Sequence, residues 1–401
     1  MKLPLLQFLE TVKRVSDNSE YVNAISRHAR DLSQNELPLL ITLGSIAQKC
    51  GVPYDYVNSI LHRHTNPYKT FRIKKRSGGS RTICVPDIPL MRVQRWIHKE
   101  ILLSTAAKAI LSKWSTAYAE NSSHIKNAEK HLGAQVIIKV DISNFFESIS
   151  ERQVYKVFKN LQFRPIVAFG LTRICTRQIN TSKSMDLRVR KSYRRWNRRK
   201  RTTEINRRLF LANAVGHLPQ GAPTSPMLSN LVCLDIDNQL AVLAREHEMV
   251  FTRYADDITF SGPLMDVSKM REVYSKICEI VGVFGLRVNA KKTRFIRAGC
   301  RMQITGIVIN NGIARISREY RDRIRQELFY LKKCGLESHV EKVSNRNALS
   351  YLLGLDARIN YVISIEPKCG NIFRVAFDEL FPEFPSVRSI MIANDSPNDE
   401  M

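Results

Sequence analysis

FTRYADDITFSG, residues 251–262, is a β-type pattern that two adjacent aspartates interrupt. Two neighbouring acidic residues usually mark a solvated turn. Here the flanks are apolar and β-branched, which predicts strand on both sides of the pair. We therefore expect Asp256 and Asp257 at the tip of a hairpin, within an apolar setting where like charges need a compensating cation.

A third aspartate follows another strand signal, AQVIIKVDISNFF, residues 134–146. Its apolar run is short and β-branched enough to be a buried strand that ends near Asp141. Nucleotidyl transfer needs two divalent cations about 3.5–4 Å apart, one for the attacking hydroxyl and one for the triphosphate. Mg²⁺ prefers hard carboxylate oxygens together with substrate phosphates. The sequence therefore predicts Asp141, Asp256 and Asp257 as metal ligands.

The charge balance points to a polyanionic partner. The chain has 401 residues, with 63 Lys+Arg against 37 Asp+Glu and a formal net charge of +26. This excess favours nucleic acid binding, and the length favours two or three subdomains. The sequence contains no apolar run of about 18 residues and no CxxC pair among its scattered cysteines. We expect a soluble, cytoplasmic protein with reduced thiols.

The N-terminal part is expected to be helical to about residue 60, with one helix around residues 5–12 and another beginning near Pro38. The stretch YKTFRIKKRSGGSRTICVPD, residues 68–87, then predicts a hairpin with Lys and Arg on both strands. After about residue 311 the pattern becomes helical again, and one helix is expected to stop at Gly335. The last residues are polar and are expected to be disordered.

A basic segment, residues 178–210, stands apart in composition because it contains RVRKSYRRWNRRKR. Such a density of positive charge repels itself unless an anion binds. One interpretation is a solvated, disordered loop; aromatic residues among the arginines favour contact with nucleic acid instead. The candidates for RNA binding here are Arg194, Arg195 and Trp196.

Three motifs, in this order along the chain, resemble those of reverse transcriptases. VDISNFF, residues 140–146, resembles the first aspartate motif of that family, and LPQGAPTSP, residues 218–226, resembles its LPQG…SP loop. YADD, residues 254–257, resembles the YxDD box. The resemblance implies an α+β right-hand polymerase fold with fingers, a palm of antiparallel sheet plus helices, and a helical thumb. The expected division is an N-terminal helical region (1–60), fingers and palm (61–310), thumb (311–385) and a disordered tail (386–401).

The resemblance also implies roles for single residues. The metal ligands would be Asp141, Asp256 and Asp257, with Asp257 the least direct, holding two Mg²⁺ ions for which Mn²⁺ can substitute. Phe146 matches the bulky gate that rejects a ribose 2′-hydroxyl, although core packing explains it equally well.

Besides Phe146, three side chains would contact the incoming dNTP, and a further one, Lys292, would be catalytic. Lys75 and Arg81 match the cations of the fingers that grip the triphosphate, with Lys74 as a competitor for the role of Lys75. Gln220 would touch the incoming nucleotide. In NAKKT, residues 289–293, Lys292 would protonate the leaving pyrophosphate, or it is a solvated lysine on a turn.

Two patches favour the bacterial retron branch. NAEKH, residues 127–131, fits the NAxxH signature of retron enzymes, and ITG, residues 304–306, resembles their VTG. This branch implies a cognate structured noncoding RNA of the msr-msd type, priming from a guanosine 2′-hydroxyl, and a branched msDNA product. It also implies antiphage defence with a separate effector protein. Asn127 and His131 are candidates for RNA recognition, although a lone His is more often a hydrogen-bonded structural residue.

Three alternatives remain at the level of sequence. Two are enzymes, a group II intron-like reverse transcriptase and another bacterial defence reverse transcriptase without the branched product. A further class of enzyme, the RNA-dependent RNA polymerases, is not among the three. It fits less well, because Tyr-Ala-Asp-Asp replaces the Gly-Asp-Asp usual there. The third is an inactive RNA-binding scaffold, which the three aspartates argue against.

Overall fold

A computed structural model describes residues 5–74, 78–178, 215–343, 347–382 and 384. Several predictions fall outside these ranges, so the structure does not bear on them. They concern Lys75, Arg194, Arg195, Trp196, nearly all of the basic segment 178–210, and the tail 386–401.

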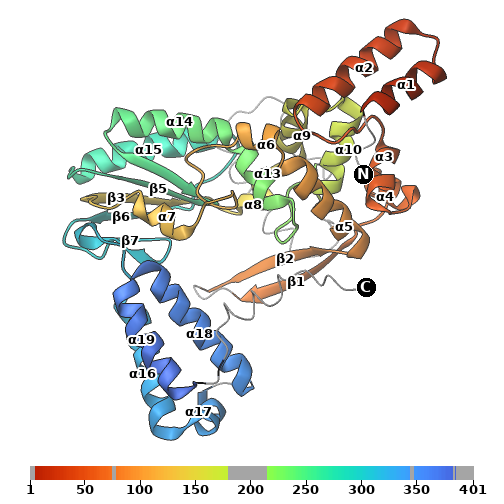
Figure 1. Ribbon diagram of the computed structural model, residues 1–401. Helices are drawn as coiled ribbons and strands as arrows, with labels where there is room; N and C mark the ends of the chain where they lie inside the picture. The colour runs from red at the N-terminus through yellow and green to blue at the C-terminus, as the bar shows by residue number, and fades with distance from the viewer. Residues whose placement is uncertain (1–4, 75–77, 179–214, 344–346, 383, 385–401) are drawn as a thin grey trace.

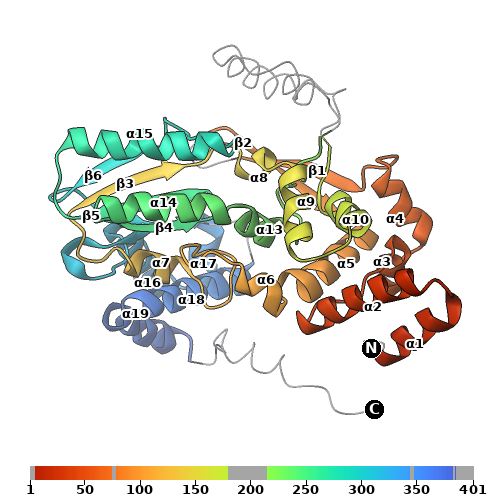
Figure 2. The same ribbon diagram turned by 90° about the horizontal axis from the view of Figure 1, so that it is seen from above.

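A four-stranded antiparallel sheet lies at the centre of the fold (Figure 1). Its strand order is β4-β5-β3-β6. The strands are β3 (Val136–Asp141), β4 (Val250–Tyr254), β5 (Asp257–Gly262) and β6 (Arg294–Arg297). Helices α14 (Leu234–Glu246) and α15 (Val267–Val283) lie side by side over one face, as the view from above shows (Figure 2).

The alternation along β3 explains how the sheet is buried on both faces. Val136, Ile138 and Val140 belong to the large hydrophobic cluster that includes α14 and α15, whereas Ile137 belongs to a second cluster formed with the C-terminal helices. Successive side chains on a strand point to opposite faces. The predicted strand ending at Asp141 is therefore confirmed, and it is held from both sides.

The N-terminal part is helical, as expected. It comprises α1 (Leu5–Val15), α2 (Ser19–Gln34), α3 (Leu43–Cys50) and α4 (Tyr54–Leu61). The prediction of a helix start near Pro38 was wrong, because α3 begins at Leu43. The side chain of Thr42 caps this helix by accepting a hydrogen bond from the N–H of Ser45 at 3.3 Å.

The predicted hairpin is present as β1 (Tyr68–Lys74) and β2 (Ser80–Pro86), which pair antiparallel (Figure 1). Lys74 lies opposite Ser80, and Ile73 lies opposite Arg81. All four side chains are exposed at this end of the hairpin. Basic residues thus occupy both strands, as the sequence indicated.

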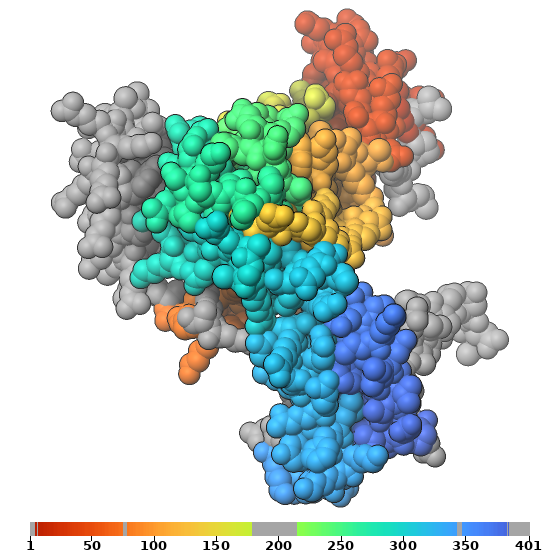
Figure 3. All heavy atoms as spheres, turned by 90° about the vertical axis from the view of Figure 1, so that its left-hand side faces the viewer, coloured from red at the N-terminus to blue at the C-terminus, as the bar shows by residue number. Residues whose placement is uncertain are grey.

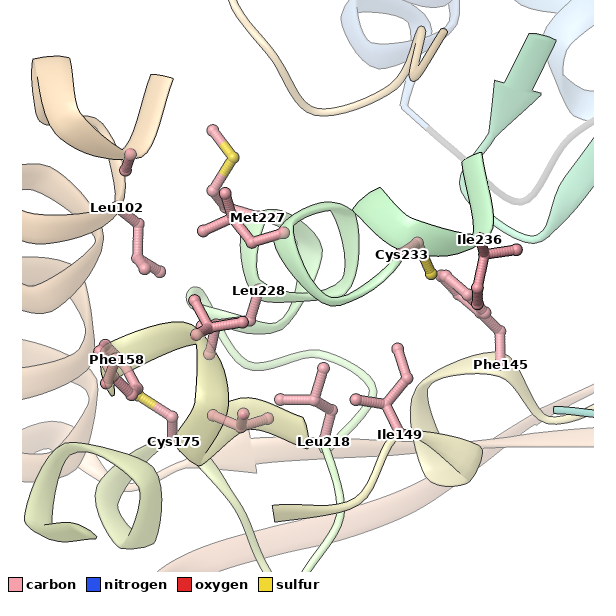
Figure 4. Close-up of a cluster of buried hydrophobic side chains, with 14 of the residues drawn as sticks. Leu102, Phe145, Ile149, Phe158, Cys175, Leu218, Met227, Leu228, Cys233 and Ile236 are labelled. Carbon is pink, nitrogen blue, oxygen red and sulfur yellow. The ribbon is translucent and has the colours of Figure 1, made fainter. Parts of the chain in front are cut away.

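Short helices precede and follow β3 along the chain. They are α5 (Ile88–Ile97), the π-helix His98–Leu102, α6 (Thr105–Ala109), α7 (His124–Glu129), α8 (Phe145–Ser148), α9 (Glu151–Asn160), α10 (Pro165–Cys175) and α13 (Ser225–Val232). Figure 4 shows part of their shared core, in which Ile149 lies beside Leu218, and Phe145 lies next to Ile236 and Cys233. The segments that follow Asp141 and that surround the Gln220 turn are thus fixed by one apolar cluster.

The C-terminal helices form a separate lobe with its own hydrophobic cluster (Figure 3). The lobe follows the small hairpin of β7 (Gln303–Ile304) and β8 (Ile307–Val308) and a 3-10 turn (Asn310–Gly312). Its helices are α16 (Arg318–Cys334), α17 (Leu336–Val343), α18 (Ala348–Ile365) and α19 (Pro367–Leu380). The predicted stop of α16 at Gly335 is confirmed by the positive φ of 77° at this residue.

Among the described residues, no single helix has the length and apolar character needed to span a membrane. Only α13 and α14 taken together, as a pair bent by 52°, meet these criteria.

Candidate active site

The sheet register brings the three predicted carboxylates together. Asp141 at the end of β3 lies directly opposite Asp257 at the start of β5. Asp256 occupies the turn between β4 and β5, where Ala255 has a φ of 56°, and its carbonyl accepts a hydrogen bond from the N–H of Ile142 at 2.9 Å. The backbone bond ties the turn to the end of β3. Three carboxylates from two separate sequence motifs therefore lie at the same end of the sheet.

Two lysines pair with the carboxylates at this end of the strands. Lys292 Nζ donates to Asp141 Oδ2 at 2.7 Å, and Lys139 Nζ lies 2.8 Å from Asp257 Oδ2. Asn289 supports the first pair, because its N–H donates to the carbonyl of Asp141 at 2.7 Å. The structure thus brings the predicted Lys292 to the carboxylates. The sequence analysis did not single out Lys139, which lies on the same face as Asp141 because the two are two residues apart on one strand.

The carboxyl pKa values show that this edge favours added positive charge. Burial raises the pKa of Asp256, and the neighbouring charge of Asp141 raises it further. Burial also raises the pKa of Asp257, against the opposing effect of the Lys139 ammonium. A raised pKa means that the ionised form is disfavoured until a cation compensates it.

The donor set fits divalent cations, although no closed cage exists. Within the described ranges, no group of three or more His, Cys, Asp or Glu side chains already forms a set of metal ligands. Oxygens of Asp141 and Asp257 contact lysine ammonium groups, which occupy positions where a positive charge is favourable. Mg²⁺ in polymerase sites typically uses only one or two carboxylates plus substrate phosphates. The three aspartates are therefore candidate ligands for a site that substrate phosphates would complete.

The turn that carries Gln220 packs against the basic hairpin. The carbonyl of Gln220 accepts a hydrogen bond from the N–H of Cys84 at 2.7 Å. Gly221 has a φ of 109°, and a Cβ there would lie 2.9 Å from the Ile83 side chain and 3.1 Å from the carbonyl of Cys84. Only glycine permits this approach. Gln220 and Arg81 are thus held on neighbouring segments, as the prediction of a shared nucleotide site requires.

Helix α13 starts directly behind this turn. The helix begins at Ser225 with Pro226 in its first turn, where a missing N–H costs nothing. Ser225 Oγ donates to the carbonyl of Pro219 at 2.7 Å and so closes the turn onto the helix.

Phe146 lies just after Asp141 on α8 and is half-buried, whereas its neighbour Phe145 is buried. The two ring centroids are 5.4 Å apart. Phe146 packs against the large hydrophobic cluster yet keeps part of its surface accessible. The role of a gate and that of a core residue are compatible at this position.

The register of the hairpin separates Lys74 from Arg81. Residues directly opposite each other in an antiparallel pair share a face, and successive residues alternate. Arg81 therefore lies on the face of Ile73, and Lys74 lies on the other face with Ser80. Lys74 does not share a face with Arg81, which weakens it as the competitor for the triphosphate role.

The structure buries Asn127 and His131, which were predicted to contact RNA. His131 is only 1% exposed, with Nδ1 2.6 Å from Ser261 Oγ and Nε2 2.7 Å from Thr252 Oγ1. Asn127 is fully buried and accepts a hydrogen bond from Thr116 Oγ1 at 2.7 Å. Burial leaves neither side chain available to a ligand, so we correct the assignment. Asn127 ties α7 to the segment that contains Thr116, and His131, just after α7, contacts strands β4 and β5.

The fold acquires a pH dependence from His131. Burial, aided by the charge of Lys130, lowers the pKa of His131 from 6.5 to about 3. Because the unfolded chain binds a proton over this interval, stability is complete above about pH 6.5 and falls by up to about 1.4 kcal/mol per unit of pH below it. We expect urea unfolding of His131→Gln to differ less between pH 7 and pH 5 than that of the wild type. His217, whose pKa burial lowers to about 4, contributes equally to both proteins; an undiminished pH difference would contradict this assignment.

A buried ion pair that no sequence motif reveals lies beneath the turn Tyr254–Asp257, which we call the catalytic turn. Arg253 and Asp237 are both fully buried, and the guanidinium donates two hydrogen bonds to the carboxylate, at 2.6 and 2.7 Å. Arg253 Nη1 also donates to the carbonyl of Ala255 and to Asn230 Oδ1, both at 3.2 Å. This side chain therefore holds the turn that presents Asp256.

Comparison with known proteins agrees with this geometry. The family model described as "Reverse transcriptase (RNA-dependent DNA polymerase)" matches residues 73–331. The retron Ec86 reverse transcriptase of Escherichia coli is 27% identical over 360 residues, covering 88% of this chain and 97% of the relative. The retron Mx65 reverse transcriptase of Myxococcus xanthus is 30% identical, covering 86% of this chain and 74% of the relative.

Among solved structures, telomerase from Candida albicans in complex with a fragment of telomeric RNA has a TM-score of 0.44 and 12% identity, over 88% of this chain and 68% of that one. We draw no conclusion from so distant a likeness. Reverse transcriptases are RNA-directed DNA polymerases that use an RNA template and depend on divalent metal ions. On the family match and the retron relatives, this chain belongs to the reverse transcriptases, within the bacterial retron branch.

Proposed function

We propose that this chain copies part of a cognate msr-msd noncoding RNA into single-stranded DNA, starting from a guanosine 2′-hydroxyl and yielding branched msDNA. The observation that carries the proposal is the meeting of Asp141, Asp256 and Asp257 at one sheet edge, with Lys292 Nζ 2.7 Å from Asp141 Oδ2. The retron relatives support a retron-type enzyme, and the choice of RNA and primer is what the resemblance to that branch implies.

Each side chain has a defined task in this reaction. Two Mg²⁺ ions, or Mn²⁺ in their place, would be held by the three carboxylates and would supply activation of the primer hydroxyl and neutralisation of the triphosphate. Arg81 and Lys75 grip the triphosphate, and Gln220 contacts the incoming dNTP. Lys292, on a flexible stem beside the carboxylates, delivers a proton to the departing pyrophosphate.

Phe146 is proposed to reject ribonucleotides through its accessible ring surface. Phe146→Ala opens space beside Asp141, so we expect the preference for dNTP over rNTP to fall by about a hundredfold. The comparison is the ratio of kcat/KM for the two nucleotides in single-nucleotide extension. Phe146→Tyr keeps the bulk and serves as the control. A preference unchanged in Phe146→Ala would reduce Phe146 to a packing residue.

The C-terminal lobe, residues 311–385, is proposed as the thumb. It follows the fingers and palm, residues 61–310, along the chain. Exposed cations line α16, among them Arg318, Arg325 and Lys332. Contacts to phosphates release counterions, so we expect affinity for RNA to fall by about a thousandfold or more between 50 and 200 mM salt if six or more phosphates are contacted. The dissociation constant across a salt series measures this, and a flat profile would argue against a phosphate-based grip.

The biological setting follows from the same branch of the family. We propose a cytoplasmic antiphage defence unit in which the enzyme, its noncoding RNA and its msDNA act with a separate effector protein. The alternatives are a group II intron-like reverse transcriptase, another defence reverse transcriptase with a linear product, and an inactive scaffold.

The test is to purify the protein from cells that carry its native genomic neighbourhood and to extract the bound nucleic acid. Treatment with RNase and then with debranching enzyme should leave a short DNA that shortens at the debranching step. Linear DNA would overturn the branched product while leaving the polymerase intact. Bound RNA without polymerase activity would favour the scaffold.

A further inference from the structure

Tyr118 is an exposed aromatic residue in an unusual backbone conformation. Its side chain is 44% exposed, and its φ is 62°. A bulky residue with positive φ is unfavourable and persists only where its surroundings hold it. Such a residue beside a reaction site is a candidate for function.

The backbone on either side of Tyr118 is held firmly. The N–H of Arg253 donates to the carbonyl of Trp114 at 3.0 Å, and the N–H of Thr116 donates to the carbonyl of Arg253 at 2.9 Å. Asn230 Nδ2 donates to the carbonyl of Ala117 at 2.7 Å. Residues 114–117 thus form an extra edge beside β4, anchored by the same buried polar groups that support the catalytic turn.

The register of this edge places Tyr118 at the reaction site. Ser115 pairs in parallel with Arg253, so Tyr118 and Asp256 each follow three residues after this bridge. The electrostatics agree, because burial raises the pKa of Tyr118, the Asp256 carboxylate adds to the effect, and the Arg81 guanidinium opposes it. Tyr118 is therefore close enough to the Asp256 turn and to Arg81 of the hairpin to feel both charges.

The order of strands indicates which nucleic acid strand lies there. The primer hydroxyl must react near Asp141, which ends β3. On one side of β3 lie β5, then β4, and then the segment 114–117. Lys292, which pairs with Asp141, lies on the other side. Three strand spacings amount to about 14 Å, a distance that a base pair spans and a single base does not. The partner of the primer strand is therefore expected beside this segment.

We propose that the ring of Tyr118 packs against a nucleobase of the template strand at the active site and thereby positions the template. This inference rests on the proposed RNA-directed synthesis. Aromatic rings suit the task, because every base has a π-face and the template must be read whatever its sequence. Tyr118 is a positioning residue, since the chemistry itself belongs to the carboxylates.

The first test compares single-nucleotide extension of a DNA primer on an RNA template by three proteins. Tyr118→Phe retains the ring and should match the wild type. Tyr118→Asn removes the ring with a residue that tolerates positive φ, and it should weaken template–primer affinity by about tenfold. The control is Tyr21→Asn, at a tyrosine that is 48% exposed on α2, and it should leave affinity unchanged.

The second test identifies the contact itself. An abasic nucleotide at the templating position should abolish the difference between wild type and Tyr118→Asn, because no base remains to stack. In the wild type, which needs no variant to fold, 5-iodouridine in the template should cross-link to Tyr118 on irradiation. Cross-linking from the primer strand alone, or a persistent difference on the abasic template, would overturn the inference.

The two proposals fail in different ways. A wild-type protein without RNA-directed synthesis removes the proposed function. A fully active wild type whose Tyr118→Asn variant binds and extends normally removes only the role of Tyr118.

Discussion

Asp256→Asn is expected to reduce DNA synthesis on an RNA template by on the order of a thousandfold or more, because a metal-ligating carboxylate supports several kcal/mol of transition-state stabilisation. Asp141→Asn should have a similar effect, since Asp141 is directly paired with Asp257 on the neighbouring strand. Primer extension at saturating nucleotide measures both. The residual rate should not be restored by a higher nucleotide concentration.

The same substitution should leave the fold intact or stabilise it. Burial and the charge of Asp141 raise the pKa of Asp256, so the ionised carboxylate is unfavourable in the protein without metal. We expect the Tm of Asp256→Asn to equal or exceed that of the wild type, with RNA affinity retained. Asp55→Asn, at an exposed position on α4, is the matched control. A variant that loses activity only because it unfolds would contradict the assignment.

Arg253→Met is expected to destabilise the protein by about 3–5 kcal/mol, because it leaves the fully buried Asp237 carboxylate without its partner. It also removes the hydrogen bond to the carbonyl of Ala255, so the surviving folded protein should have a reduced kcat. Urea unfolding measures the first effect, and primer extension measures the second.

A double variant separates charge from packing at this site. Arg253→Met with Asp237→Leu replaces the pair by apolar side chains, and it should recover most of the lost stability. The catalytic turn would still lack its support, so activity should stay low. If the double variant were as unstable as Arg253→Met, the loss would come from packing and not from the stranded charge.

The local sequence pattern was sufficient to predict the strands that flank the three aspartates. Apolar and β-branched runs flank Asp141 and the Asp256–Asp257 pair, and each run forms a strand in the expected place. The hairpin at residues 68–87 and the end of α16 at Gly335 were equally readable, because glycines and strand formers act over a few residues.

Contacts between distant segments could not be predicted in this way. Nothing in the sequence distinguishes Asp237 from Asp235 as the partner of Arg253, since the choice depends on which face of α14 meets the sheet. His131 looked available to RNA, but α7 packs it against Thr252 and Ser261. Tyr118 carried no local signal, because its position follows from a parallel bridge to a residue far along the chain.

The most direct test of the carboxylate site uses Fe²⁺ in place of Mg²⁺. With ascorbate and peroxide, iron bound at the site should cleave the backbone near Asp141 and near the Asp256–Asp257 turn, because these segments are adjacent in the sheet. Excess Mg²⁺ should suppress both cuts, and Asp256→Asn should weaken them. Cleavage confined to other segments, or cuts that Mg²⁺ does not suppress, would contradict the claim that these three carboxylates hold the catalytic metal ions.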